Sequence, residues 1–520
     1  MNAKIRKRQS KRKAREREKQ LAARRAKIAR RLDPSRNNED RGPVFAAGAC
    51  RFELADRIRG IDCGGIGLLH SMTRKIGLAE AIDERLSLLK IHRPYHESDH
   101  VLNIAYNILC GGTCLDDIER RRNDEVFLDA LDVVRIPDPT TAGDFCRRFS
   151  AEDVLELHEA FDQARRKVWA EQPAEFFEQA IIDLDGTLVP TTGECKQGME
   201  YSYKKVWGYH PLLVSLANTN EPLRIINRMG NRPSHEGAWA EADNCIELCR
   251  DGGFRKILLR GDTDFTQTEY LDRWDQDGVQ FVFGVDSMPN LCDLADKLPK
   301  GSWKVLHRRE KRPLKGKPRA KPENVKQQIV KEREFENIRL RHEDIAEFDY
   351  RPGKCDRAYR MVVVRKNLTI EKGETALIDE VRYYFFITND LESPIEQIVF
   401  QSNDRCNQEN VIEQLKNGAQ ALRAPLGDLN SNWAYMVIAS LAWQLKAWAA
   451  LIVPEPPGRW RQRRREEKRT LLRMEFKRFI ANFIQIPCQI VRQGRRLIYR
   501  MLSWNPWRPT FFRLVDVLQC

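Results

Sequence analysis

The sequence lacks the marks of a secreted or membrane-spanning protein. Its first residues, MNAKIRKRQSKRK, contain no apolar run, so we expect no secretory signal. The mean hydropathy of −0.58 argues against a membrane protein. One long apolar stretch occurs at 433–453, but Gln444 and Lys446 interrupt it, and polar or charged groups are unfavourable at a bilayer centre. We therefore predict a buried core helix there and no membrane partner.

Paired cysteines with the spacing of a zinc site are also missing. The thirteen cysteines are scattered along the chain. Cys110/Cys114 and Cys245/Cys249 have i,i+4 spacing, but neither pair has a matching second pair. We predict free thiols in a reducing cytosol rather than a zinc ribbon or a disulfide framework.

Positive charge is abundant but unevenly distributed. The net charge is +14, and residues 1–32 carry +13, residues 301–334 carry +8 and residues 459–500 carry +11, which leaves −18 on the rest of the chain. Segregated basic blocks suit a polyanion such as DNA, and an acidic remainder suits divalent metal ions. The candidate DNA contacts in the second and third blocks are Arg308, Arg309, Lys311, Arg463, Arg464 and Arg465.

Changes in composition and periodicity divide the chain into six segments. We predict a basic arm and linker (1–45), a helical N-terminal DNA-binding domain (46–178), the first part of a catalytic core (179–289), a β-rich insertion (290–398), the second part of the core (399–455) and a basic C-terminal helical region (456–520). The insertion is too long for a simple loop, because structureless connections of such length are rare in compact domains.

From residue 180 the pattern becomes that of an α/β sheet. The strand-like runs are AIIDLDGTLV, YHPLLVSLA, PLRIINRM, KILLRGD and VQFVFGVD, with helical stretches on either side of KILLRGD. Continuous apolar runs between helices indicate a sheet that is covered on both faces. The order β-β-β-α-β-α-β resembles that of the ribonuclease-H-like fold. We therefore predict a ribonuclease-H-like mixed α/β sheet with helices on both faces, interrupted by the β-rich insertion and preceded by the helical domain.

The stretch IIDLDGTLVP (181–190) resembles the Asp-x-Asp-Gly-Thr motif of haloacid-dehalogenase-type phosphatases. In that alternative, Asp183 is the nucleophile and Asp185 the general acid. Such enzymes also have a later Gly-Asp-x-x-x-Asp motif, and here Thr266 stands where its second aspartate is expected. The phosphatase alternative also leaves the basic blocks without a role.

A second interpretation makes the carboxylates metal ligands for phosphoryl transfer on DNA. Two-metal catalysis requires carboxylates that converge from separate elements. Asp185 in the first strand, Asp262 at the end of the fourth strand and Glu409 on a helix that begins near 404 meet this requirement. Asp183 is the alternative first ligand, because side chains two residues apart share a face of a strand. The predicted cofactors are two Mg²⁺ ions, or Mn²⁺.

The segment DRCNQENVIEQLK carries the most informative spacing. Arg405, Glu409 and Lys416 form the pattern Arg-x3-Glu-x6-Lys, which on a continuous helix presents base, acid and base on one face. This pattern resembles the Tyr-x2-Arg-x3-Glu-x6-Lys signature of insertion-sequence DDE transposases, although Ser402 stands at the tyrosine position. The resemblance extends over PTTAGDFCRRF (139–149), YKKVWGYHPLLV (203–214) and LLRGDTDF (258–265).

The resemblance implies a function and a set of roles. Asp185, Asp262 and Glu409 would be the catalytic metal ligands, and Arg405 and Lys416 would hold transposon-end DNA. The implied reaction is metal-dependent cleavage at insertion-sequence ends followed by strand transfer into double-stranded target DNA. A homodimer in the synaptic complex and a bacterial, nucleoid-associated cytoplasmic location are expected. A non-catalytic DNA-binding protein with a decayed core is a second alternative beside the phosphatase.

Three residues near these motifs are assigned structural roles. We expect Asp264 to cap the helix that follows it. His210, which precedes Pro211 in a strand region, is expected to pack within the fold. Stacking on DNA bases is an alternative role for Trp207, but core packing is the usual role of tryptophan, so we expect Trp207 to pack within the fold as well.

Overall fold

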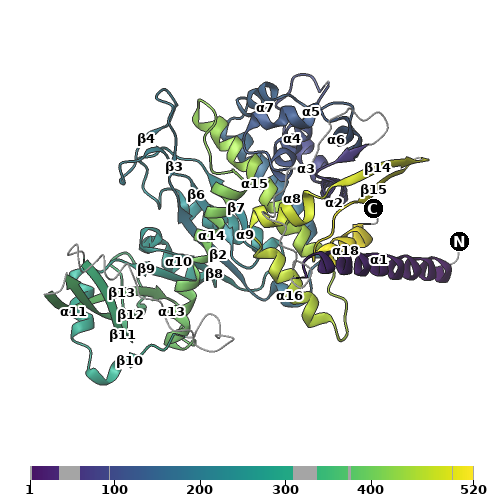
Figure 1. The fold of residues 1–520 in the computed structure, drawn as a ribbon. Coiled ribbons are helices and arrows are strands. Elements are labelled where there is room, and N and C mark those ends of the chain that lie inside the picture. The colour runs from purple at the N-terminus through teal and green to yellow at the C-terminus, as the bar shows by residue number, and fades with distance from the viewer. Residues whose placement is uncertain are drawn as a thin grey trace. The chain divides into compact units, whose positions relative to one another are not determined.

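The structure is a computed structural model that describes residues 3–33, 59–92, 94–308, 336–372, 376–494 and 496–518. It consists of two compact units (Figure 1). Unit 1 joins Met1–Gln172 with Gln414–Cys520, and unit 2 comprises Pro173–Glu413. Both terminal parts of the chain therefore belong to one unit, and the predicted sheet belongs to the other.

Nine strands of unit 2 form one mixed sheet in the order β10-β11-β12-β13-β9-β8-β2-β6-β7. The five predicted apolar strands are β2 (Ala180–Gly186), β6 (Leu212–Leu216), β7 (Glu221–Ile226), β8 (Ile257–Gly261) and β9 (Gln280–Val285). Strands β2, β8 and β9 are parallel, whereas β6 is antiparallel to both β2 and β7. The mixed α/β sheet is confirmed, and the carboxyl ends of its three parallel strands meet at one edge.

Residues predicted as a β-rich insertion extend the same sheet. They form β10 (Lys304–Val305), β11 (Glu336–Tyr350), β12 (Tyr359–Lys372) and β13 (Ala376–Thr388). Strand β13 pairs antiparallel with β9, with Phe385 opposite Val285. Because an unpaired strand edge invites association with other chains, β13 also protects the edge that β9 would otherwise expose.

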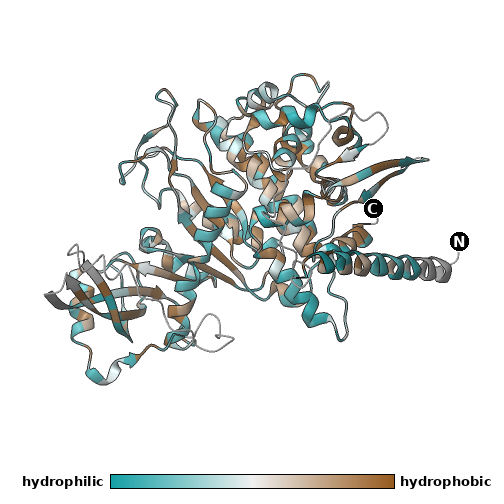
Figure 2. Ribbon diagram, viewed as in Figure 1, coloured by the Kyte–Doolittle hydropathy of each residue, from teal (hydrophilic) through white to brown (hydrophobic). Residues whose placement is uncertain are grey.

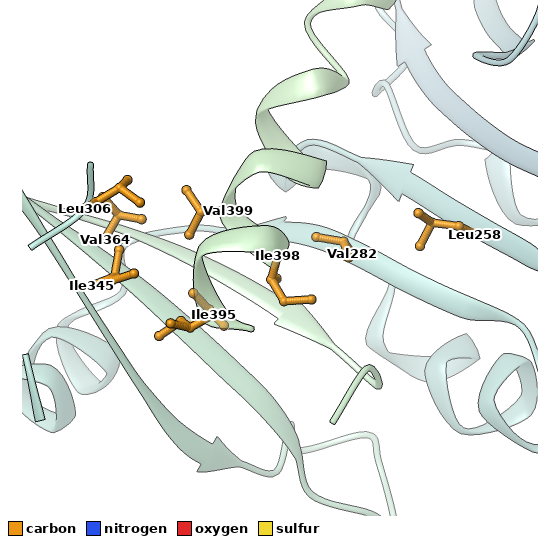
Figure 3. Packing of buried hydrophobic residues seen from close by; sticks show 9 residues of the cluster. Leu258, Val282, Leu306, Ile345, Val364, Ile395, Ile398 and Val399 are labelled. Atoms are coloured by element: carbon orange, nitrogen blue, oxygen red, sulfur yellow. The ribbon is translucent and has the colours of Figure 1, made fainter. Parts of the chain in front are cut away.

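Helix α13 (Ile395–Asp404) packs on the sheet where the core strands and the inserted strands meet (Figure 3). Ile395, Ile398 and Val399 recur at helical spacing and form its inward face. They belong to a buried apolar cluster that also contains Leu258, Val282, Leu306, Ile345, Val362 and Val364. Full burial of each such side chain contributes roughly 1.5–3 kcal/mol, so this packing fixes the position at which α13 ends.

Unit 2 also contains further helices and a small sheet. The helices are α9 (Ala238–Asp251), α10 (Leu271–Gln276), α11 (Pro289–Asp296) and α14 (Asn407–Glu413). The small sheet has the order β3-β5-β4, with β3 (Val189–Pro190), β5 (Trp207–Tyr209) and β4 (Glu200–Tyr201). It lies between β2 and β6 in the chain, so it follows directly from the strand that carries Asp185.

Unit 1 is mainly helical. Its longer helices are α1 (Ala3–Arg31), α2 (Ile66–Lys75), α3 (Leu78–Arg85), α4 (Glu97–Leu109), α7 (Pro139–Cys146), α8 (Ala151–Ala170), α15 (Leu429–Ile452), α16 (Arg461–Leu472) and α18 (Arg508–Leu518). Shorter ones are α5 (Ile118–Arg122), α6 (Glu125–Ala130) and α17 (Phe476–Phe479). Helix α1 is mostly hydrophilic along the part that Figure 2 colours by hydropathy.

Helix α15 contains the long apolar stretch of the sequence. By length and composition it is the one helix in the described parts of the chain that is able to cross a membrane, but 94% of its most apolar window is buried inside the protein. It packs against α4, α8 and α16. Gln444 accepts a hydrogen bond from Arg165 Nη2 (2.8 Å), and Lys446 Nζ donates to the carbonyl oxygen of Leu472 (2.6 Å). The polar residues that interrupt the stretch thus have partners inside unit 1.

The C-terminal region was predicted to be helical, but it also contains two strands. Cys488–Gln493 (β14) and Arg496–Met501 (β15) form an antiparallel pair that β1 (Gly60–Ile61) extends. Alternating apolar residues on either side of Gly494, whose φ is +62°, produce this hairpin rather than a helix. All eleven cysteines within the described residues are free thiols.

Candidate active site

Asp185 and Asp262 lie at the carboxyl ends of neighbouring parallel strands. Asp185 is the penultimate residue of β2, and Asp262 directly follows β8. Arg405, which caps the C-terminus of α13, lies between them. Its Nη1 is 3.4 Å from Asp185 Oδ2, and its Nη2 is 3.9 Å from Asp262 Oδ2. One guanidinium therefore bridges two of the predicted metal ligands.

Asp183 has a different partner and a different environment. Its two carboxylate oxygens accept hydrogen bonds from Arg260 Nε (2.6 Å) and Nη2 (2.8 Å), and the two side chains are 1% and 4% exposed. Burial raises the pKa of Asp183, and Arg260 opposes that effect. A carboxylate that is enclosed and doubly bonded to arginine is poorly placed to attack phosphate or to bind a metal ion. This geometry favours Asp185 over Asp183.

Glu409 is brought to Asp185 by its neighbour in α14. Gln408 is buried, and its Nε2 donates to the carbonyl oxygens of Asp183 (3.0 Å) and Leu213 (3.1 Å). These bonds attach the first turn of α14 to β2 and β6. Glu409 is exposed and lies near enough to Asp185 to raise the pKa of that carboxyl.

The predicted continuous helix through Arg405, Glu409 and Lys416 is wrong. The chain turns at 405–406, so Arg405 ends α13, Glu409 lies in α14, and Lys416 lies in a π-helix at Gln414–Gly418. Arg405 and Glu409 still meet at Asp185, because the turn brings the end of α13 and the start of α14 to the same strand. Lys416 is half-buried and belongs to unit 1.

The carboxylates at this edge perturb one another electrostatically. Burial raises the pKa of Asp185 to about 7; Arg405 opposes the shift, while Asp262 and Glu409 add to it. The pKa of Asp262 is also raised, first by burial and then by Asp264 and Asp286, again against Arg405. Negative charge is therefore concentrated beyond what one arginine neutralises.

Two residues around Asp262 differ from the sequence-based expectations. Asp264 was expected to cap the next helix, but the capping side chain is Asp262 itself, whose Oδ1 accepts from the backbone N–H of Asp264 (3.1 Å). Asp286, which is not among the predicted site residues, directly follows β9 and raises the pKa of Asp262. The signal was present, because VQFVFGVD ends in aspartate just as KILLRGD does.

The donor set fits hard divalent cations. Asp185, Asp262 and Glu409 offer only carboxylate oxygens, which Mg²⁺ and Mn²⁺ prefer, and their mutual repulsion favours a cation between them. Their oxygens are not gathered as tightly as in a formed metal site. Within the described residues, the acidic, histidine or cysteine side chains whose ligand atoms all lie within 4.8 Å of one another are those of Asp83, His96 and Glu97. Metal binding at the strand ends thus requires the carboxylates to close around the ion.

The predicted DNA contacts have varied environments. Arg308 is paired with the buried Glu343, to which its Nη2 donates at 2.8 Å. Arg309 and Lys311 lie outside the described residues. On α16, Arg463 is 68% exposed and lies 3.5 Å from Glu467, and Arg464 and Arg465 are paired with Glu467 (2.9 Å) and Glu455 (3.4 Å).

His210 and Gly186 explain the turn after Asp185. The Nδ1 of His210 lies 2.8 Å from the carbonyl oxygen of Arg232, to which it donates, and the ring is buried, so the structural role predicted for His210 holds. A Cβ at Gly186 would lie 2.9 Å from His210 Nε2, which leaves no room for a side chain there. Trp207 was expected to pack in the core, but it is 43% exposed and packs against Tyr201.

Comparison with known proteins defines the class of this molecule. The family model for the transposase DDE domain, group 1, matches residues 62–520, so the chain belongs to that family. The prediction of a DDE transposase is confirmed, and the phosphatase and non-catalytic alternatives are not favoured. DDE transposases are DNA-acting enzymes that use divalent metal ions.

Solved structures with some similarity include one transposase complex. It is the cryo-EM structure of a piggyBac transposase synaptic complex with hairpin DNA, which has 12% sequence identity to this chain and a TM-score of 0.35. The match covers 81% of this chain and 82% of that one. No curated protein sequence matches the chain.

Proposed function

We propose that this transposase cleaves DNA at the ends of an insertion sequence and joins the freed 3′-hydroxyl to target DNA. Asp185, Asp262 and Glu409 would hold two divalent ions, Mg²⁺ or Mn²⁺. The observation that carries the proposal is the Arg405 bridge between Asp185 and Asp262, with Glu409 close enough to raise the pKa of Asp185. Such ions stabilise the attacking and leaving oxygens of a phosphoryl transfer.

The chain's own side chains position the substrate. The Arg405 contacts of 3.4 and 3.9 Å are long for a charge-assisted hydrogen bond, so the guanidinium is loosely held by the carboxylates. With Asp185 and Asp262 engaged in holding divalent ions, Arg405 would be available to bind the scissile phosphate. Lys416 would supply a second phosphate contact. Asp183, fixed by Arg260, keeps β2 in register beneath the site.

A ribonuclease-H-like core is the finer fold that we assign to unit 2. Its support is the chain order of β2, β6 and β7, then α9, β8, α10 and β9, which is the order expected of that fold. In this assignment the segment 290–398 is an insertion at the β9 edge. The segments 46–178 and 456–520 and the arm 1–45 bind DNA. The catalytic core is formed by 179–289 and by 399–413, the part of the predicted 399–455 segment that belongs to unit 2.

The partners follow from the reaction. Double-stranded DNA of the element ends and of the target binds the basic segments, and phosphate contacts there give affinity without reading sequence. Two ends must be cut together, so two chains pair in the synaptic complex. We place the protein in the bacterial cytoplasm, on the nucleoid.

Substitution of Glu409 tests the assignment directly. Glu409→Gln and Asp185→Asn are expected to lower metal-dependent cleavage of DNA carrying the element ends by about a thousand-fold or more, because metal stabilisation of the transition state contributes several kcal/mol. Glu413→Gln, one helical turn further on, is the matched control and should cleave normally. Cleavage at the wild-type rate by Glu409→Gln would overturn the proposal.

A further inference from the structure

A second group of metal-ligating side chains lies in unit 1, at the junction of α3 and α4. Asp83 is in the last turn of α3, His96 is the N-cap residue of α4, and Glu97 is the first residue of α4. One ligand atom from each lies within 4.8 Å of the others. His92, in the connecting loop, adds a second imidazole: its Nε2 is 3.4 Å from Glu97 Oε2, and its ring stacks on that of His96 at 5.2 Å.

Backbone and hydroxyl donors hold the two carboxylates in place. Glu97 Oε1 accepts from the backbone N–H groups of Leu88 (2.9 Å) and Leu89 (3.0 Å). Asp83 accepts from Ser98 through its backbone N–H (2.8 Å) and its hydroxyl (2.9 Å). Bonds of this kind orient the ligands of metal sites. Glu97 Oε2 is the carboxylate oxygen that faces the His92 imidazole, at 3.4 Å.

Among the residues that the structure describes, no lysine or arginine forms an ion pair with this group. Within the described residues, the ion-pair partner of Glu97 is His92, and Asp83 pairs with no cationic side chain. The helix N-terminus offsets only about half a charge.

We propose that Asp83, His96 and Glu97, joined by His92, bind one zinc-like divalent transition-metal ion that links the end of α3 to the start of α4. Mixed imidazole and carboxylate ligands select Zn²⁺ and its neighbours over Mg²⁺, which prefers oxygen alone. Two carboxylates also match the charge of a divalent ion. The site is separate from the carboxylates at the strand ends and has no role in phosphoryl transfer.

Equilibrium dialysis of the full chain against Zn²⁺ in excess Mg²⁺ tests this site. One tightly held zinc ion per chain is expected, and it should remain in a variant that combines Asp185→Asn, Asp262→Asn and Glu409→Gln. Asp83→Asn and His96→Asn should lose it. His92→Asn, an exposed position, should weaken it by roughly ten- to a hundred-fold, the scale of supporting-ligand losses. Co²⁺ substitution should give the visible absorption of a tetrahedral ion.

His342→Asn is the matched control, because His342 lies 3.4 Å from Asp344 without belonging to such a group. It should leave the bound zinc unchanged. A zinc-induced rise in melting temperature in the wild type and His342→Asn, but not in His96→Asn, shows that the loss is not a folding defect. No zinc retained by the wild type, or equal retention by His96→Asn and Asp83→Asn, overturns the proposal.

A different observation supports a second proposal, at the hairpin YSYKKVW that follows Asp185 in the chain. Tyr201, Tyr203 and Trp207 are 52%, 70% and 43% exposed, which is unusual for three large aromatic residues in seven positions. Tyr201 and Trp207 pack with ring centroids 4.1 Å apart, and Lys204 Nζ lies 5.2 Å from the Tyr203 ring centroid. The turn thus presents aromatic faces beside a cation.

A chain of contacts connects this hairpin to the candidate active site. The Tyr203 ring centroid is 6.2 Å from that of His210, and His210 Nε2 lies against Gly186, the residue after Asp185. Strand β5 leads into β6, in which Leu213 pairs with Asp185. Tyr203 therefore contacts His210, and His210 lies against the residue that follows the candidate metal ligand Asp185.

We infer that Tyr203 and Trp207 stack on unpaired DNA bases next to the scissile phosphate, with Lys204 on the adjoining backbone. This inference rests on the proposed function. Aromatic faces interleaved with lysine match single-stranded nucleic acid, because every base offers a stacking face and the backbone is anionic. Duplex DNA, whose bases are already stacked, fits these faces poorly.

Fluorescence titration of the full chain with a short single-stranded oligonucleotide, and with the same sequence as a duplex, tests this inference. Tyr203→Ala and Trp207→Ala are each expected to weaken single-strand binding by roughly five- to a hundred-fold, with little effect on duplex binding. Tyr203→Phe should restore it, since the ring is kept. Tyr384→Ala is the control, because Tyr384 is a 40% exposed tyrosine of β13 with Lys366 Nζ 4.3 Å from its ring centroid, and it lies outside the segments assigned to DNA.

Equal losses for single strand and duplex, or no loss in either alanine variant, overturn the inference. These outcomes are independent of cleavage. A failed Glu409→Gln test with intact single-strand binding would remove the catalytic assignment alone.

Discussion

Arg260 and Asp183 form a two-pronged ion pair across the parallel strands β8 and β2, with both side chains buried. They are directly paired in the register of the two strands. The Nη1 of Arg260 also donates to the carbonyl oxygen of Gln401 in α13 (2.8 Å). One arginine thus connects the first strand, the fourth strand and the helix that delivers Arg405.

Replacing Asp183 should therefore destabilise unit 2. Asp183→Asn leaves a buried arginine without a counter-charge, and breaking such a pair from one side costs about 3–5 kcal/mol. Urea unfolding followed by circular dichroism and by hydrogen exchange of β2 peptides measures the change. Asp185→Asn is the control, because it removes a carboxylate whose raised pKa shows that the fold disfavours its charge. If Asp183→Asn kept full stability yet lost metal binding, Asp183 would be the ligand.

Arg405 competes with cations for the same carboxylates. Arg405→Gln is expected to bind Mn²⁺ about five- to tenfold more tightly, because the loss of a partly screened charge near 4 Å is worth about 1 kcal/mol. The same variant should cleave DNA more slowly, since a phosphate contact is lost. Mn²⁺ affinity is read from the electron paramagnetic resonance signal of the free ion. Weaker Mn²⁺ binding in Arg405→Gln would contradict the competition.

Much of this site was predictable from the sequence, because strand ends in α/β sheets follow from apolar runs. Asp185 and Asp262 were assigned in this way, and Asp286 followed the same rule but was passed over. The helix through Arg405 and Glu409 was not predictable from spacing, since the turn at 405–406 depends on tertiary bonds. The buried apolar cluster fixes α13, which ends at Arg405, and the hydrogen bonds of Gln408 to β2 and β6 fix α14, which carries Glu409.

The ion pair between Asp183 and Arg260 was also not predictable from the local sequence pattern. Asp183 and Asp185 share a strand and a motif, and only the neighbouring strand distinguishes them, by placing Arg260 beside the first. The same holds for β13 against β9, where the insertion joins the core sheet instead of forming a separate layer. The Asp183–Arg260 pair and the pairing of β13 with β9 both depend on the register between strands that are distant in the sequence. This register is not predictable from the local sequence pattern.

Asp286 should contribute to metal binding without being required for it. Asp286→Asn removes a charge that raises the pKa of Asp262, so divalent affinity should fall by roughly three- to tenfold, the effect of one screened charge. Isothermal titration with Mn²⁺ measures this. Asp293→Asn, on the following helix α11, is the control. A complete loss of binding in Asp286→Asn would make Asp286 a ligand rather than a neighbouring charge.

The arginines of α16 should differ in their effect on DNA affinity. Arg463 is 68% exposed, so Arg463→Ala should weaken binding equally for all sequences and reduce the slope of log affinity against log salt by about 1. Arg464 is 23% exposed and pairs with Glu467 at 2.9 Å, whereas the contact of Arg463 with the same carboxylate is longer (3.5 Å), so Arg464→Ala should affect the salt slope less. Filter binding over a range of salt concentrations separates the two. Identical slopes for wild type and Arg463→Ala would place α16 away from DNA.

Lys446 should make the stability of unit 1 depend on pH. It is fully buried in α15, and burial lowers its pKa to about 7 from the value near 10.4 of a free lysine. Between these two values the unfolded chain carries a proton that the folded chain lacks, so unfolding takes up a proton and the free energy of unfolding rises with pH. The rise is at most about 1.4 kcal/mol per pH unit and disappears below pH 7, where both states are protonated.

Lys446→Met, which keeps the length and removes the charge, should abolish this slope between about pH 7 and pH 9. Denaturant unfolding followed by pulse-labelling hydrogen exchange, read on peptides of α15, measures the stability of the helix itself. The exposed Lys204 provides the control Lys204→Met, which should retain the wild-type slope. A slope that persists in Lys446→Met would mean that Lys446 stays protonated inside the fold, held by the Leu472 carbonyl and the face of Trp443, 3.8 Å from its Nζ.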